Sequence, residues 1–191
     1  MSKAIQDLMN EHRLIEQVLG SLETFAERLE RGEPAERSTV KDYGDFFRNF
    51  ADKCHHGKEE DRLFVKMLDH GFPREYGPLA VMYAEHVEGR GHVRALAETG
   101  AGTGLLTQEE REDVARHARA YVPLLRAHIV KEDNVLYPMA MQALPGAVLD
   151  ALAREFDAFE REVMGEGQHE RFHALAESLI EAYPPDPEKM A

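Results

Sequence analysis

Two ten-residue stretches decide the fold, HHGKEEDRLF at residues 55–64 and HIVKEDNVLY at residues 128–137. His, Lys, Glu and Leu recur at the same offsets in both, and an aromatic residue follows the Leu. The His and the Glu of each stretch are four residues apart, about one turn of an α-helix, so their side chains point to the same region. The chain therefore repeats a helical unit that carries a paired imidazole and carboxylate.

Glycine and proline residues divide the remaining chain into helical segments, and β-branched clusters are nearly absent. We predict helices over residues 3–30, 38–69, 75–99, 107–141, 146–163 and 168–182. Ser38 and Thr107 are the expected N-caps, with Glu110 completing a capping box after Thr107. Pro123 is expected either to kink the fourth helix or to mark its true start.

Apolar residues recur every three or four positions in the first, third and fourth segments, as in helices that share a core. Polar residues interrupt these apolar faces. For example, His12 lies between Leu8 and Ile15 on the apolar face of the first segment. The pattern predicts an all-α bundle over residues 1–143. Residues 144–191 are expected to form a C-terminal helical hairpin packed on the same domain.

Composition limits the possible functions. The 23 basic and 36 acidic residues give a net charge of −13, which disfavours binding to nucleic acid and to anionic lipid. No apolar run approaches the ~18 residues needed to span a bilayer, and charges interrupt the N-terminal stretch where a signal peptide would be apolar. The single cysteine, Cys54, agrees with a reducing compartment, so we expect a cytoplasmic protein.

Six polar residues occupy core positions of the predicted bundle. Their burial has a cost in free energy, so it indicates that something binds them. A carboxylate in an apolar interior costs several kcal/mol unless a charge compensates it. A pair of metal ions would compensate both glutamates, and nitrogen and oxygen donors without thiolate suit iron or manganese. The candidate metal ligands are His12, His55, Glu59, His86, His128 and Glu132.

The order His, His-x-x-x-Glu, His, His-x-x-x-Glu, with Leu-aromatic after each pair, resembles the hemerythrin-like family, also called the HHE cation-binding domain. The resemblance covers roughly residues 5–140. It implies an up-down four-helix bundle around two iron ions joined by an oxo or hydroxo bridge, with Glu59 and Glu132 also bridging. Oxygen-carrying hemerythrins have a further histidine one turn after His86, whereas this chain has Arg90.

Four other side chains are expected close to the ions without binding them: His56, Tyr83, Arg90 and Tyr121. His56 and Glu60 form an alternative pair, but the repeat aligns Leu63 with Leu136 only when His55 matches His128. His56 then lies about 100° round the helix, behind the ligands or at the surface. His169 and His173 are also four residues apart, and an ordinary helix surface is favoured over a metal site there.

The expected function is binding or reduction of O₂, peroxide or nitric oxide at the di-iron centre, in oxygen sensing or storage or in oxidative or nitrosative stress defence. This includes a possible peroxide- or O₂-reducing activity, with no catalytic residue assigned. One alternative is iron storage, donation or sensing without redox turnover. Another is a metal-stabilised interaction module whose last two helices dock a protein partner.

Overall fold

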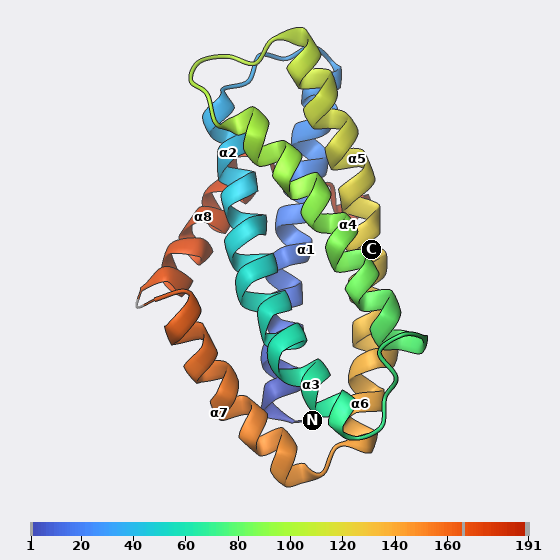
Figure 1. Cartoon of the computed structure of the whole chain (residues 1–191). Coiled ribbons are helices and arrows are strands. Elements are labelled where there is room, and N and C mark those ends of the chain that lie inside the picture. The colour runs from blue at the N-terminus through green and yellow to red at the C-terminus, as the bar shows by residue number, and fades with distance from the viewer. Residues whose placement is uncertain (1, 166, 190–191) are drawn as a thin grey trace.

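The computed structural model describes residues 2–165 and 167–189, and every named element among them is a helix (Figure 1). The β-structure in this part of the chain is one isolated bridge between Glu36 and Leu105. The all-α prediction is therefore confirmed. Across the described residues, none of the helices combines the length and the apolar character needed to cross a membrane.

Four helical rods lie alongside one another (Figure 1). The first is α1 (Lys3–Glu30), and the third is α4 (Gly77–Gly100). The second joins α2 (Arg37–Phe46), η1 (Phe47–His56), η2 (Glu59–Leu63) and α3 (Phe64–Asp69). The fourth joins α5 (Gln108–Lys131), η3 (Glu132–Leu136) and α6 (Tyr137–Ala143). After these come α7 (Gly146–Val163), α8 (Gln168–Ala182) and the short 3₁₀ segment η4 (Pro187–Lys189).

The second and fourth rods contain π-helical segments at the two repeats, where a continuous α-helix was expected. Segment η1 ends at His56 and η2 spans Glu59–Leu63, so they contain most of the first repeat, and η3 begins at Glu132 of the second. In a π-helix each N–H bonds to the carbonyl five residues back, so a turn holds more residues and neighbouring side chains diverge less. Such segments occur frequently at functional sites.

The helix starts agree in part with the expectations. The Thr107 hydroxyl accepts a hydrogen bond from the Glu110 N–H at 3.3 Å, and the Glu110 carboxylate accepts one from the Thr107 N–H, which confirms the capping box. Ser38 is not an N-cap, because α2 begins at Arg37, whose N–H donates to the Gly104 carbonyl. Helix α5 runs through Pro123 from Gln108, so Pro123 does not mark its start.

Buried apolar side chains form two clusters, one on each side of a polar layer. On α1, one cluster includes Ile5 and Leu8, and the other begins at Ile15. On the fourth rod, Ile129 belongs to one cluster and Leu136 to the other. The polar positions predicted from the sequence therefore lie inside the molecule, between two apolar regions that separate them from solvent.

Helices α7 and α8 pack against the first two rods. The Phe159 ring of α7 lies so close to Gly57 that a Cβ there would be 2.7 Å from its Cζ atom. The Ser21 hydroxyl of α1 donates to the Leu179 carbonyl of α8 at 2.8 Å and also bonds the Tyr43 hydroxyl. The C-terminal helices thus cover the side of the molecule next to the first repeat.

Candidate metal centre

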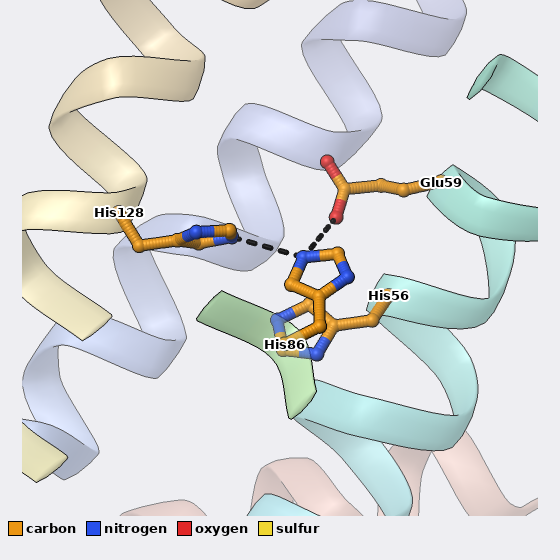
Figure 2. A group of neighbouring side chains, drawn as sticks. All are labelled: His56, Glu59, His86 and His128. Atoms are coloured by element: carbon orange, nitrogen blue, oxygen red, sulfur yellow. Dashed lines mark hydrogen bonds and ion pairs between the residues drawn. The ribbon is translucent and has the colours of Figure 1, made fainter. Parts of the chain in front are cut away.

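The six residues predicted as ligands lie together in the polar layer, and each is at most 1% exposed. Their donor atoms fall into two groups in which all donors lie within 4.8 Å of one another. We call the group of His12, His55 and Glu132 the first position. The second position contains His56, Glu59, His86 and His128, which approach from three different rods (Figure 2).

Histidine pairs from neighbouring rods define the two positions. The Nε2 atoms of His12 and His55 are 2.9 Å apart, and those of His86 and His128 are 3.0 Å apart. Two donors bound to the same ion at about 2.1 Å, with a right angle between the bonds, are separated by about 3 Å. Both pairs therefore have the spacing of ligands that share a metal ion.

The outer nitrogen of each histidine is held by a carboxylate. The Nδ1 atoms of His12, His55, His86 and His128 lie 2.7, 2.8, 2.6 and 2.9 Å from oxygens of Asp133, Glu11, Glu60 and Glu85. A carboxylate partner places the ring proton on Nδ1 and leaves the Nε2 lone pair facing inward. Within each pair two lone pairs then face each other, an arrangement that requires a proton or a cation between them.

The two buried glutamates lie between the histidine pairs. Glu132 places one oxygen 3.1 Å from His12 Nε2 and the other 3.1 Å from His128 Nε2. Both of these oxygens and Oε2 of Glu59 are buried without a hydrogen-bond partner among the described residues. Unsatisfied buried carboxylate oxygens are costly, and metal coordination removes that cost. The donor set thus fits a pair of cations.

The same contacts shift the pKa values of the candidate ligands in the metal-free protein. Burial opposes the charged form of His128, but Glu132 and Glu85 raise its pKa to about 9. Burial and the neighbouring charge of His12 lower the pKa of His55 to about 3. Burial and the charge of Glu132 raise the pKa of Glu59. In metal-free protein, protons on His128 and Glu59 therefore offset the negative charge of the buried carboxylates, and metal binding must release them.

Each carboxylate that contacts a histidine Nδ1 atom is paired with a Lys or Arg side chain. Two of these cations recur in the sequence repeat. Lys58 and Lys131 occupy equivalent repeat positions, and they pair with Glu11 and Glu85 respectively. The other two pairs are Arg13 with Asp133 and Arg90 with Glu60. Every histidine of the two pairs is thus held by a carboxylate that is itself neutralised, which fixes the direction of each Nε2 atom.

Lys58 and Lys131 differ in burial, and this difference gives a test of the network. Lys58 is 2% exposed, whereas the Lys131 side chain is 39% exposed. In metal-free protein we expect Lys58→Met to lower the free energy of unfolding by about 3–5 kcal/mol, since buried Glu11 loses its partner. Lys131→Met should cost about 1 kcal/mol or less. Urea denaturation of both variants measures this, and equal losses would contradict the proposed network.

His56 is buried rather than at the surface, so the alternative that it is exposed is wrong. Its ring stacks on His86 with centroids 3.9 Å apart, and it belongs to the second group of donors (Figure 2). The π-helical backbone explains this placement, because it brings two consecutive side chains of η1 toward the core. His56 Nδ1 is 3.4 Å from Asp52, the same kind of contact that the other histidines make.

The other expected neighbours lie at different distances from the donors. Arg90 donates to Asp52 and Glu60, both at 2.8 Å, so it contacts the carboxylates behind the second position. The Tyr83 hydroxyl accepts from Arg74 at 3.3 Å, and Tyr121 packs against Phe47; neither contact is with the candidate donors.

Tyr137 contacts the donors instead. Its hydroxyl donates to Glu59 Oε1 at 2.8 Å and lies 3.3 Å from His12 Nε2. In the sequence, Tyr137 is recognisable only as the aromatic residue that ends the second repeat. Its counterpart Phe64 has no hydroxyl, so the two positions are not equivalent.

A third group of possible donors, less buried than the first two, contains Glu11, Glu160 and His169. The Lys58 ammonium already pairs with both carboxylates, at 3.5 Å from Glu160, so a cation is present there without a metal. His169 and His173 have ring centroids 4.4 Å apart, next to Phe50. The two rings thus pack on Phe50, and the preference for a helix surface over a metal site at these histidines stays a prediction.

Comparison with known proteins gives one family and three relatives. Residues 3–140 match the family model described as Hemerythrin HHE cation binding domain. The chain is 25% identical over 164 residues to uncharacterized proteins of Mycobacterium bovis and Mycobacterium tuberculosis. The matched region is 85% of this chain but 63% of each relative, so the chain spans less than two thirds of their length. No solved structure matches the chain.

Proposed function

Because this chain belongs to the family of hemerythrin HHE cation-binding domains, we propose that it is a di-iron protein that reacts with O₂, peroxide or nitric oxide. The metal would lie in an up-down four-helix bundle formed by residues 1–143, with residues 144–191 as a helical hairpin on the same domain. The observation that carries the proposal is the convergence of two inward-facing imidazole pairs on buried carboxylate oxygens that lack hydrogen-bond partners.

The residues divide between two ions. His12 and His55 would hold one ion, and His86 and His128 the other, with His56 as a further ligand of the second. Glu59 and Glu132 lie between the pairs, and each has oxygens within 4.0 Å of histidines from both positions. This placement supports a bridging role for both glutamates.

Iron would supply the redox chemistry, which no side chain of the layer can supply alone. The chain's own residues arrange and isolate it. The apolar clusters above and below exclude bulk water, and the carboxylates behind the histidines hold the imidazoles in place. The Tyr137 hydroxyl is a neutral hydrogen-bond donor that contacts both Glu59 and His12 of the first position.

The experiment that tests this function is consumption of hydrogen peroxide by iron-loaded protein. The ferrous protein should be oxidised by peroxide or O₂ within seconds, and peroxide should continue to disappear when a chemical reductant is supplied. An electrode measures the consumption, with a variant lacking metal as the control. Iron that is released to a chelator without peroxide consumption would favour the alternative, storage or donation of iron.

A further inference from the structure

We propose that a groove between η1 and α4 binds a small aromatic anion, at a site separate from the metal positions. The groove has a volume of about 560 Å³, which is in the usual range for small-molecule sites. Three arginines line it: Arg48 from η1, and Arg90 and Arg94 from α4. Such a cluster is unexpected on a chain whose net charge is −13.

The positive charge in the groove is incompletely neutralised. Arg90 is paired with Asp52 and with Glu60. The side chains of Arg48 and Arg94 are exposed, and neither guanidinium forms an ion pair or a hydrogen bond with another residue in the described ranges. Glu98 is the other acidic residue of the lining, and it is not within ion-pair distance of either arginine. The groove thus offers two unpaired guanidinium groups to a ligand.

The remaining lining is apolar and favours a ligand that has an apolar part. Val93, Ala97 and Ala101 also line the groove, and their spacing of four residues places them as a strip of small side chains along α4 and its C-cap. Planar guanidinium groups bind carboxylates, phosphates or sulfonates through paired hydrogen bonds and also stack on aromatic rings. A ligand with an aromatic body and one anionic group satisfies both parts of the surface.

The groove also lies against the metal centre. Asp52 contacts His56, and the Arg90 guanidinium donates to Glu60, which holds Nδ1 of His86. A bound anion would therefore compete with these carboxylates for Arg90. This connection deepens the proposed function, but anion binding itself does not depend on the presence of iron.

A matched pair of fluorescent probes tests the site in the protein as purified. Anilinonaphthalene sulfonate carries the anionic group, whereas phenylnaphthylamine has the same aromatic skeleton without it. We expect the sulfonate to bind roughly tenfold more tightly or better than the neutral probe, one per chain, and less tightly as salt increases.

Variants locate the binding. The double replacement Arg48→Gln, Arg94→Gln should weaken sulfonate binding roughly tenfold. The control Arg154→Gln, at an exposed position on α7, should not change it. The proposal is overturned if both probes bind equally, or if the double variant binds the sulfonate as wild type does. Metal content is measured separately, so failure here leaves the di-iron proposal standing.

Discussion

Replacing Glu132 with glutamine is expected to empty both metal positions. The substitution keeps the size of the side chain but removes the charge that lies between the two histidine pairs, where its oxygens are 3.1 Å from His12 and His128. We expect iron affinity to fall roughly 100-fold or more at both positions, beyond what loss of an outer partner causes. Equilibrium dialysis against ferrous iron measures the loss.

Two comparisons separate loss of the site from loss of the fold. Glu109→Gln changes an exposed residue in the first turn of α5 and should bind iron as wild type does. Metal-free Glu132→Gln should keep the helix content of metal-free wild type in its circular dichroism spectrum, because glutamine has nearly the same size as glutamate and fills the same space between His12 and His128. A folded variant that keeps two irons would contradict the bridging role of Glu132.

His56→Ala distinguishes the two positions. Since His56 belongs to the second group of donors only, its loss should weaken one iron and leave the other bound. His70→Ala removes an exposed histidine outside both groups and serves as the control. If His56→Ala retains both irons at wild-type affinity, His56 is a packing residue against His86 and not a ligand.

Removal of iron is expected to produce the second large effect, a loss of stability. Without metal, the layer between the two apolar clusters holds facing imidazoles and unsatisfied carboxylate oxygens. At a metal concentration about 1,000 times the dissociation constant, binding stabilises the folded state by about 4 kcal/mol per site. For a chain of this length the melting temperature should rise by roughly 10 °C or more.

Differential scanning calorimetry of metal-free and iron-loaded protein measures this shift. Glu132→Gln supplies the control, because iron should leave its melting temperature nearly unchanged if the stabilisation comes from the two positions. Equal melting temperatures for metal-free and loaded wild type would show that the polar layer is stable alone, which contradicts the unsatisfied-oxygen argument.

Much of the fold and of the site could be predicted because both follow from periodicity. The four-residue spacing of His55 and Glu59, and its repetition at His128 and Glu132, places these side chains on the inner faces of two helices. His12 could be predicted from its place in an apolar stripe. The structure brings these positions together as expected, although their binding of metal remains a prediction.

The sequence predicted His56 close to the ions but left open whether it lies behind the ligands or at the surface, because that depends on the local hydrogen-bonding of the backbone. The first repeat contains no proline, and its spacing fits an uninterrupted α-helix. An α-helix would direct His56 about 100° away from His55. In the structure, π-helical turns bring both residues to the core. The burial of His56 therefore follows from a backbone with more residues per turn than the α-helix that the sequence predicted.

The pairing of lysines with the carboxylates that hold the histidines is indicated in part by the sequence. Lys58 and Lys131 recur in the repeat, and an acidic residue precedes both His12 and His86 along the chain. These recurrences correspond to the pairs of Lys58 with Glu11 and of Lys131 with Glu85. The partners are on different helices, so the pairing depends on packing between rods and could not be read from spacing within one helix.

The measurement that tests the central claim most directly is the metal content of protein purified from cells grown with ample iron. Inductively coupled plasma mass spectrometry should find about two irons per chain, since the described residues include two fully buried groups of nitrogen and oxygen donors without thiolate. A single tightly bound zinc per chain, with no iron taken up on anaerobic reconstitution, would contradict the account.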